Sequence, residues 1–465
     1  MLTVKEFNAL ELEYKLFELR QNQVEVWPLA REIIYDELNT AINGSPSRKS
    51  SDKALPLKSK LIGLLWISIN SIKFFWQRYP KITYLFFAHP RRKLENGYYH
   101  DVYTDSLIKL FGESCAVAEP LFNMSHLSPT PQENLIPLDV MDFWPRALSS
   151  FWKVGFKPEV DSSILAFEKM LSQRYNVNVP VQNILRRELT RFIIAKPLVT
   201  RLLNQLQPSV LIEIVGYHRL AKVFNVITRQ KGIRTIELQH GYVSKAHISY
   251  NFPQGVQKVQ SFPSYIGLWG NVYKHHISPP LPNHNIFSAG FLYFEEKHKK
   301  LRQSVPKANT VVFISQWTIG KELAKLAVDL SKMIPDVSII YRLHPEERKN
   351  ARVNYPELYQ EQRIIVDDSN SDLYELLINT ETIVGVYSTA LIEAAMLGKQ
   401  VVVAKLPGWE AFKDLTESTS SFEFSENSAS SLLTTIKSNK SGHQAISYVD
   451  WLAPFDIAAF EALTK

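Results

Sequence analysis

Cysteine is almost absent from this chain of 465 residues, since Cys115 is the single one. One thiol forms no internal disulfide and offers no cysteine-based metal site, so we expect a protein of a reducing, cytoplasmic environment. Residues 1–20 also lack the basic segment, apolar core and cleavage site of a secretory signal. We therefore expect a protein that is not exported.

Glycine and long apolar runs are scarce as well. The 17 glycines and 25 prolines are too few for a fibrous or low-complexity protein. The most apolar segment, residues 61–76, is shorter than the ~20 residues that cross a bilayer and contains Lys73. Two interpretations stay open: a helix buried against the first strand, which is commoner for such a run, or a helix among anionic lipid headgroups. The basic residues flanking the segment are Lys53, Lys58, Lys60, Arg78 and Lys81.

The net charge of +7 does not point to a nucleic-acid partner. The basic residues are scattered, and no recognisable DNA- or RNA-binding signature accompanies them. The positive charge instead favours a membrane surface or anionic substrates.

The order of apolar segments predicts an α/β protein with two doubly wound domains. Residues 1–50 are expected to form an N-terminal helical extension, and short apolar runs that alternate with amphipathic helices follow it. Such runs are typical of parallel strands covered on both faces. We predict a first Rossmann-like domain over 51–300, a second over 301–440, and a C-terminal helix within 441–465 that packs back toward the first. The strands are expected at 81–88, 209–215, 234–238, 264–269 and 286–290, then at 310–314, 337–343, 363–366, 382–386 and 400–404.

In the first predicted domain, Gln239, His240 and Gly241 directly follow a strand. Ligands of doubly wound sheets bind beyond the carboxyl ends of the strands, so His240 is a candidate base or phosphate donor in the cleft that the two domains face. The alternative is a structural histidine that satisfies a buried carbonyl. The carboxylates available as a base are Glu213, at a strand end, and Asp105, in the loop after the first strand, although each could instead serve as a cap or surface residue.

In the second predicted domain, Arg342, His344 and Pro345 end one strand, and the proline fixes the backbone after the imidazole. A second strand is followed by Tyr387, Ser388 and Thr389, which open a helix. Hydroxyls and free backbone N–H groups therefore meet at a positive helix end, where an anion is favoured. The alternatives are an ordinary strand-ending proline and simple N-capping.

Further polar groups complete the candidate donor site. Glu393 lies one turn inside the same helix, where its carboxylate could accept hydrogen bonds from ribose hydroxyls. A third strand-to-helix loop contains Gln316, Thr318 and Gly320 but lacks the glycine spacing of a dinucleotide or P-loop motif. The histidines show no metal-ligand spacing, so we expect neither a metal nor a cofactor.

As a set, these segments resemble a known group of enzymes. The runs LQHG, FPSYIGLWG, IFSAGF, RLHP and VYSTALIEAAMLGKQVVV are similar to those of bacterial surface-carbohydrate glycosyltransferases of the GT-B fold. The His-Pro and Ser-Thr pairs resemble bacterial sialyltransferases and capsule Kdo transferases, and His-Gly with His-Pro resembles the CDP-glycerol glycerophosphotransferases. The resemblance covers about residues 80–440.

The resemblance implies that His344, Ser388 and Thr389 bind the donor phosphate, that Glu393 lies near the ribose, and that His240 acts on the acceptor side. The acidic motif that supplies the base in sialyltransferases is missing here, so the base stays open. The implied donor is a CMP-linked ulosonic acid such as Kdo or sialic acid, and the implied acceptor is a surface polysaccharide or lipid-linked glycan at the cytoplasmic face of the inner membrane. A polyol-phosphate transferase, a nucleotide-sugar epimerase and a non-catalytic assembly protein remain alternatives.

Overall fold

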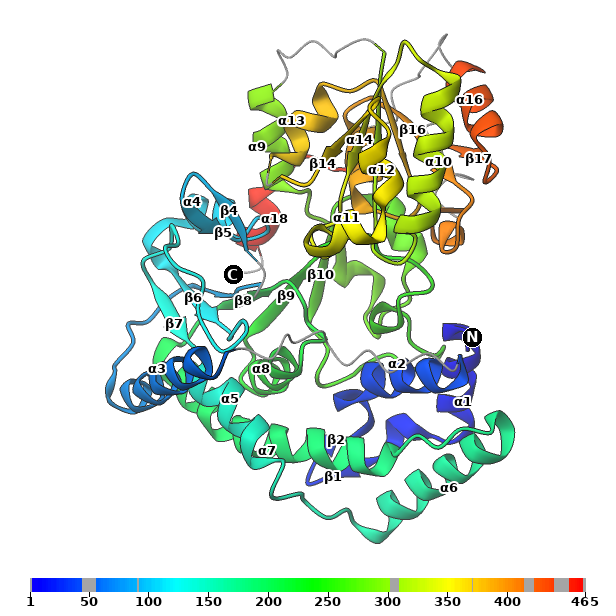
Figure 1. Cartoon of the computed structure of the whole chain (residues 1–465). Helices are drawn as coiled ribbons and strands as arrows, with labels where there is room; N and C mark the ends of the chain where they lie inside the picture. Colours follow the sequence, from blue (N-terminus) through cyan, green and yellow to red (C-terminus); the bar gives the residue numbers. More distant parts are fainter. Residues whose placement is uncertain are drawn as a thin grey trace. The chain divides into compact units, whose positions relative to one another are not determined.

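The computed structural model describes residues 2–43, 56–89, 92–301, 309–369, 371–413, 422–438 and 451–462. The chain divides into two compact units (Figure 1). Unit 1 comprises Met1–Leu292 and Phe455–Lys465, and unit 2 comprises Tyr293–Pro454. The boundary lies before the charged helix α9 (Leu292–Leu301) rather than after it, since nearly all of that helix belongs to unit 2.

Unit 1 is built on a seven-stranded sheet in the order β11-β10-β9-β8-β3-β6-β7, and all of its neighbouring strands are parallel. Side chains of alternate residues point to opposite faces, and both faces are covered. In β3 (Tyr84–Phe87), Leu85 and Phe87 pack with α7 (Val181–Leu206) and α8 (Arg219–Gln230). Tyr84 and Phe86 pack on the other face with α4 (Asp105–Phe111) and α18 (Ile457–Ala462). The strands are β3 (Tyr84–Phe87), β6 (Cys115–Glu119), β7 (Leu135–Pro137), β8 (Val210–Glu213), β9 (Arg234–Leu238), β10 (Tyr265–Leu268) and β11 (Ile286–Ser288).

The helices of unit 1 cover both faces of this sheet, and the N-terminal helices of the chain pack together with α6 (Pro158–Tyr175) in a second core of the unit (Figure 1). They are α1 (Val4–Glu13), α2 (Arg31–Ile42), α3 (Leu57–Trp76), α4 (Asp105–Phe111), α5 (Asp139–Leu148), α6 (Pro158–Tyr175), α7 (Val181–Leu206), α8 (Arg219–Gln230) and α18 (Ile457–Ala462). Two hairpins accompany them, β1 (Arg20–Gln21) with β2 (Val24–Glu25) and β4 (Lys93–Glu95) with β5 (Tyr98–His100).

The N-terminal residues share a core with α6 and α7, so they are part of unit 1. Trp27 packs edge-on against Phe167 of α6 at a centroid distance of 5.5 Å. The guanidinium of Arg31 is fully buried, bonds Glu11 at 2.7 Å, and donates to the carbonyl oxygen of Asn251 at 2.9 Å. Glu11 thus balances the buried charge of Arg31, and the bond to Asn251 joins chain segments far apart in sequence.

Unit 2 contains a six-stranded sheet in the order β14-β13-β12-β15-β16-β17, also parallel throughout. Its strands are β12 (Thr310–Ile314), β13 (Ser338–Arg342), β14 (Ile364–Asp367), β15 (Thr382–Gly385), β16 (Gln400–Ala404) and β17 (Phe422–Ser425). Its helices after α9 are α10 (Gly320–Met333), α11 (Ala351–Asn354), α12 (Pro356–Gln360), α13 (Leu373–Ile378), α14 (Thr389–Met396) and α16 (Ala429–Ser438). Two parallel α/β sheets therefore confirm the predicted fold class.

Three strands of the two large sheets were not expected from the sequence, nor were the four strands of the hairpins. β6, β7 and β17 are short or contain alanine, glutamate and proline, so the apolar pattern does not mark them. The expected C-terminal helix is α18, whose Phe460 packs against Phe111 and Phe287 of unit 1. Among the described helices, none combines the length and the hydropathy that a bilayer crossing requires.

Candidate functional site

The carboxyl edge of the sheet in unit 1 gathers aromatic and imidazole side chains. His89 follows β3, Tyr217 follows β8, His240 follows β9 and Trp269 follows β10. These strands are neighbours in the sheet, so the residues after them meet at one edge. The ring centroids of His240 lie 6.5 Å from His89 and 5.9 Å from Tyr217.

His240 is held among neutral hydrogen-bonding groups. Its Nε2 lies 3.2 Å from the hydroxyl of Tyr217, and its backbone carbonyl accepts a bond of 2.8 Å from the hydroxyl of Tyr103. Burial lowers the pKa of His240 to about 3, and the neighbouring His89 and His247 add to this shift. The imidazole is therefore uncharged near neutral pH and can accept a proton or a hydrogen bond.

Gln239 fixes the turn that carries His240. Its Nε2 donates to the carbonyl oxygen of Gly241 at 2.8 Å, while its Oε1 accepts from the backbone N–H of Trp269 at 2.8 Å. The indole of Trp269 donates back to the carbonyl of Gln239 at 2.9 Å. The buried amide thus ties the end of β9 to the end of β10, a role that the sequence pattern alone did not reveal.

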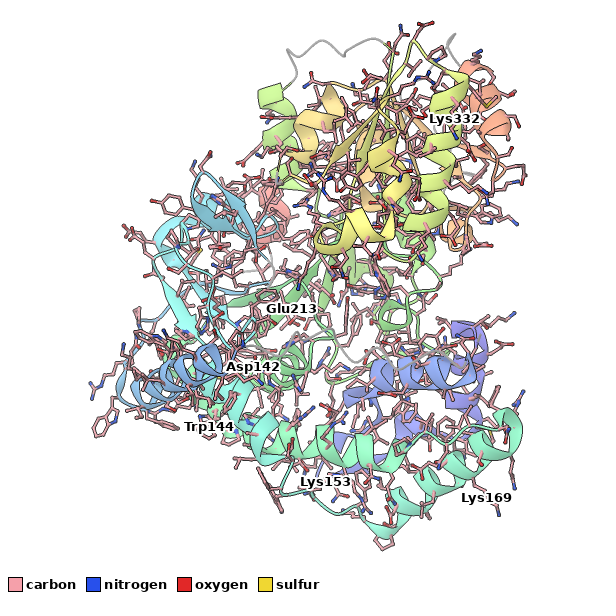
Figure 2. All side chains as sticks on the ribbon, in the orientation of Figure 1. Asp142, Trp144, Lys153, Lys169, Glu213 and Lys332 are labelled. Atoms are coloured by element: carbon pink, nitrogen blue, oxygen red, sulfur yellow. The ribbon has the colours of Figure 1, made fainter. Side chains whose placement is uncertain are left out.

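Two carboxyl groups lie buried beneath this edge. Glu213 ends β8 in the interior of unit 1 (Figure 2), is 0% exposed, and accepts a bond of 2.8 Å from Asn225. Glu237 accepts bonds from the hydroxyl of Tyr250 at 2.6 Å and from the N–H of Gly216 at 3.1 Å. A Cβ on Gly216 would lie 2.6 Å from a Glu237 oxygen and 2.7 Å from a Glu213 oxygen, so only glycine fits between the carboxyl groups.

Burial raises the pKa of both carboxyl groups. For Glu213 the nearby Glu237 raises the pKa further, and the pKa of Glu237 itself is about 7. Glu213, predicted as a possible base, is thus a fully buried group whose uncharged form is favoured. Glu237, which we did not single out from the sequence, shares this environment.

Asp105 is the first residue of α4 and organises the loop before that helix. Its carboxylate accepts from the backbone N–H of Asp101 at 3.0 Å and from the side chain of Gln132 at 3.1 Å, and lies 3.3 Å from His100. Burial and the charge of Asp101 raise its pKa to about 6. These contacts link Asp105 to the His89 loop only indirectly, through Asp101, which accepts from the N–H of His89 at 2.8 Å.

In unit 2 the carboxyl ends of β13, β12 and β15 lie side by side. They carry His344, the Gln316–Thr318 loop and the Tyr387–Ser388–Thr389 segment respectively. The Nδ1 atom of His344 accepts a bond of 3.3 Å from the backbone N–H of Glu346. This bond places the proton of the neutral ring on Nε2, the atom that would donate to an anion.

Glu347 holds this edge together and was not singled out from the sequence. The carboxylate is 3% exposed and accepts bonds from the N–H of His344 at 2.7 Å, from Ser315 at 2.9 Å and from the hydroxyl of Tyr355 at 2.6 Å. A Cβ on Gly320 would lie 2.2 Å from its oxygen. The predicted donor residue Gly320 is therefore required for packing. A glutamate three residues after His344 is the signal that could have pointed to this role.

The segment after β15 opens helix α14. Ser388 is the N-cap, and its hydroxyl accepts the N–H of Ala390 at 3.3 Å. The hydroxyl of Tyr387 bonds that of Thr318, so the loops after β15 and β12 are joined. Glu393 lies one turn into α14 and is 8% exposed. The start of α14 therefore lies beside the Thr318 loop.

Arg342 and Pro345 have other surroundings. The guanidinium of Arg342 forms an ion pair with Asp367 of β14 and donates to the carbonyl oxygen of Ser371 at 2.7 Å. Burial alone would raise the pKa of Asp367, but bonds from Ser369 and Arg342 lower it below its ordinary value. Pro345 is exposed. To bind the nucleotide donor as predicted, the guanidinium of Arg342 would have to contact the donor and Asp367 at the same time.

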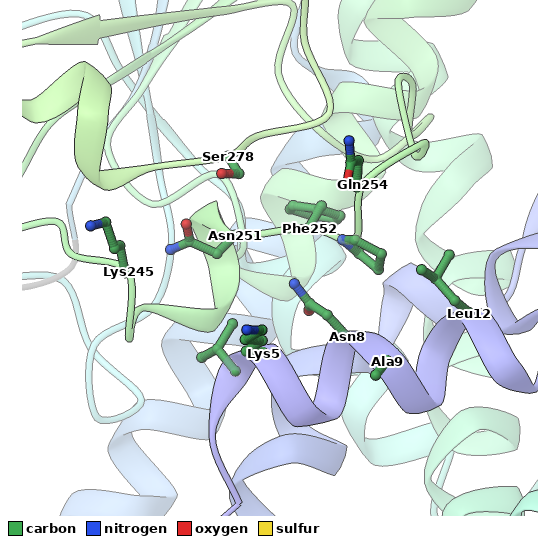
Figure 3. A pocket seen from close by; sticks show the side chains of 11 residues that line it. Lys5, Asn8, Ala9, Leu12, Lys245, Asn251, Phe252, Gln254 and Ser278 are labelled. Atoms are coloured by element: carbon green, nitrogen blue, oxygen red, sulfur yellow. The ribbon is translucent and has the colours of Figure 1, made fainter.

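A separate pocket of ≈ 350 Å³ lies beside helix α1 (Figure 3). Lys5 and Asn8 of α1 line it together with Lys245, Phe252 and Ser278. None of the residues that line it belongs to the groups after β3, β8 or β9 described above. Within the described part of the chain, no three histidine, cysteine or carboxylate side chains form a group that could hold a metal ion.

One solved structure supports the architecture. The chain matches no protein-family model and no curated protein. The UDP-GlcNAc 2-epimerase from Methanocaldococcus jannaschii aligns with a TM-score of 0.51 and 12% identity, over 83% of this chain and 99% of that one. A UDP-GlcNAc 2-epimerase from Neisseria meningitidis aligns at 0.49 and 12% over 83% and 99%, and MurG from Acinetobacter baumannii at 0.44 and 12% over 83% and 98%. The fold is GT-B, with two Rossmann-like units.

Proposed function

We propose that the protein is a glycosyltransferase that moves a sugar from a nucleotide-activated donor to a glycan or lipid-linked acceptor. The observation that carries this proposal is that His344, Thr318 and the α14 N-terminus follow three adjacent strands of the sheet in unit 2, with Thr318 bonded to Tyr387 beside the helix end. An imidazole N–H, hydroxyls and a positive helix end are donors suited to a phosphate.

The chemistry follows from the leaving group. A nucleoside phosphate that departs from a sugar gains negative charge, so donors fixed before the reaction stabilise the transition state more than the ground state. Glu347 positions the backbone of His344, and the cap at Ser388 orients the first turn of α14. In this proposal unit 2 binds the donor without a metal, and Glu393 receives the ribose.

The acceptor side is assigned to unit 1. In this proposal substrate binding raises the pKa of His240 from about 3, so that the imidazole takes the proton of an acceptor hydroxyl. The hydroxyl of Tyr217, 3.2 Å from Nε2, orients the ring. Asp105 stays a second candidate for the base, because its raised pKa of about 6 suits proton transfer near neutral pH.

The proposed identity of the substrates rests on the resemblance of the His-Pro and Ser-Thr pairs to those of sialyltransferases and capsule Kdo transferases. The proposed donor is a CMP-linked ulosonic acid such as Kdo or sialic acid. The proposed acceptor is a growing capsule, O-antigen or lipopolysaccharide chain, and the enzyme would work in the cytoplasm at the inner membrane. A polyol-phosphate transferase that uses CDP-glycerol is the second candidate, because His240 and His344 both stand at carboxyl ends of parallel strands.

A donor screen tests the proposal. The purified chain is incubated with CMP-, UDP- and GDP-sugars and with CDP-glycerol, with and without a glycan acceptor, and the released nucleotide is measured. Acceptor-dependent release of a nucleoside phosphate from one sugar donor is the expected result. Release from CDP-glycerol alone would favour the second candidate, and conversion of a sugar nucleotide without any acceptor would indicate an epimerase instead.

A further inference from the structure

Helix α3 is anchored to unit 1 by a narrow stripe. Its buried residues are Gly63, Ile67, Ser71 and Phe74, spaced three or four apart as one face of a helix requires. Gly63 lies against Met124, whose carbonyl oxygen would be 2.8 Å from an added Cβ. Ser68, Ile69 and Asn70 are half-buried beside this stripe, and the other residues of the helix are exposed.

The outward-facing residues of α3 are mostly apolar, whereas a surface helix ordinarily has polar residues on its outward face. Trp76 is 84% exposed, Leu57 74% and Ile72 61%. Soluble proteins seldom expose large contiguous apolar patches unless the patch binds a partner or a membrane. The other exposed apolar residues of α3 are Leu61, Ile62, Leu64, Leu65, Trp66 and Phe75.

Helix α5 packs beside α3 and carries further exposed apolar side chains, of which Trp144 contacts α3 (Figures 1 and 2). The indole of Trp144 donates to the hydroxyl of Ser71 at 3.0 Å, and its ring is partly exposed. The exposed side chains of Leu148, Phe151 and Trp152 follow at the C-terminal end of α5. We call the exposed apolar residues of α3 together with these four residues the α3–α5 surface.

The charged residues of α3 and of the segments beside it in sequence are all basic. Residues 56–81 contain no aspartate or glutamate, and all of their basic side chains are exposed. Exposed tryptophan and leucine side chains with lysines beside them are typical of helices that lie in a membrane interface and attract anionic headgroups. The basic side chains are Lys58, Lys60, Lys73, Arg78 and Lys81.

We propose that the α3–α5 surface docks onto a lipid bilayer that contains anionic headgroups. The apolar side chains would enter the headgroup boundary while the lysines pair with lipid phosphates. A second copy of this chain is a poorer occupant, because a symmetric interface brings the same patch together and would set these cations against one another. This inference does not depend on the transferase reaction.

Vesicle co-sedimentation of the full chain tests the docking surface. We expect binding to phosphatidylcholine vesicles that contain phosphatidylglycerol, weaker binding to phosphatidylcholine alone, and loss of binding at high salt. The variant Leu65→Glu/Trp76→Glu should bind the mixed vesicles at least about tenfold more weakly, because two charges would enter an apolar layer. Val353→Glu, at a valine of unit 2 that is 82% exposed, is the matched control and should bind normally.

A second variant isolates the charges. Lys58→Gln/Lys60→Gln/Lys73→Gln should weaken binding to the mixed vesicles by roughly fivefold for each lysine at the surface, and should leave binding to neutral vesicles unchanged. These lysine side chains are exposed, so their replacement should leave the fold intact. Thermal unfolding shows whether each variant is folded, and the lysine variant still tests the proposal when the glutamate variant does not fold.

Two results would overturn the proposal. One is a folded glutamate variant, or a lysine variant, that binds mixed vesicles as tightly as the unchanged chain. The other is a dimer of the unchanged chain, measured by light scattering without lipid, that either variant converts to a monomer, because the surface would then be an interface between copies of the chain.

Discussion

The two sheets end in chemically different edges. In unit 1 the carboxyl edge is built of histidine and tyrosine side chains above buried carboxyl groups, and burial lowers the pKa of His240 and raises that of Glu237. In unit 2 the edge is built of an imidazole, hydroxyls and a helix N-terminus, and its buried carboxylate Glu347 accepts three hydrogen bonds. One edge therefore suits proton transfer among uncharged groups, and the other suits anion binding.

The largest expected effect tests the edge of unit 1. His240→Gln should lower turnover by roughly 10²- to 10⁴-fold, the usual contribution of a general base, and should leave donor affinity nearly unchanged. Steady-state kinetics with the donor found by the screen, together with nucleotide titration, measures both quantities. His284→Gln, at an exposed histidine, is the control. If His240→Gln instead weakened donor binding and left turnover at saturating donor unchanged, His240 would bind the donor. The assignment of proton transfer to unit 1 and of anion binding to unit 2 would then be wrong.

The next effect tests the edge of unit 2. His344→Ala should weaken nucleotide binding and lower turnover by about 10²- to 10³-fold, because one fixed donor to the leaving phosphate is lost. The melting temperature should stay close to that of the unchanged chain, since the ring is only partly buried. Equilibrium binding, turnover and thermal unfolding are compared with those of His284→Ala. Near-normal turnover would contradict the phosphate assignment.

A smaller effect concerns the buried carboxyl groups of unit 1. The folded pKa of Glu237 is raised from 4.5 to about 7, so the folded state keeps a proton that the unfolded state loses. This contribution to stability is full below pH 4.5 and is lost as the pH rises through 7. Relative to Glu237→Gln, the unchanged chain should lose on the order of 3 kcal/mol of unfolding free energy across that window.

Urea unfolding of both proteins at several pH values measures this difference. The comparison between the two proteins cancels the opposite contribution of buried His218 and His247, whose lowered pKa values of about 4 make the fold less stable as the pH falls. Parallel pH profiles of the two proteins would show that Glu237 titrates normally, and the uncharged character of this edge would then be wrong.

The smallest effect concerns packing in unit 2. Gly320→Ala should cost about 1–3 kcal/mol of stability, because its Cβ would overlap the oxygens of Glu347 and Tyr355 and force them to shift. Gly155→Ala, where no atom lies within 4 Å of the added Cβ, should change stability by less than about 0.5 kcal/mol. Denaturant unfolding checks both variants, and equal stability of the two would show that the Glu347 contacts are easily rearranged.

The strands of both units could be predicted where they are continuous and apolar, as in residues 210–213 and 310–314. Strand β6, with the sequence CAVAE, was not predicted because its small side chains give a weak hydrophobic pattern. It is recognisable only by its pairing with β3. The positions of His240 and His344 at strand ends could also be predicted, since parallel strands of one sheet end at the same edge.

The partners of these histidines could not be predicted. Tyr217 reaches His240 from another strand, and Glu347 joins residues from β12, β13 and the following helices. Arg342 was expected at the donor, yet the register of β13 against β14 pairs it with Asp367. Such contacts depend on strand order, which local sequence does not encode.

The sequence by itself determined the class of fold, the strand-end positions of the polar groups and the basic, acid-free character of residues 56–81. Tertiary structure alone decided which carboxyl groups are buried with a raised pKa, which loops Glu347 joins, and which side of α3 faces outward. The physical reason is that periodicity and turn residues act locally along the chain. Burial, pKa values and exposed patches arise only when distant segments pack together.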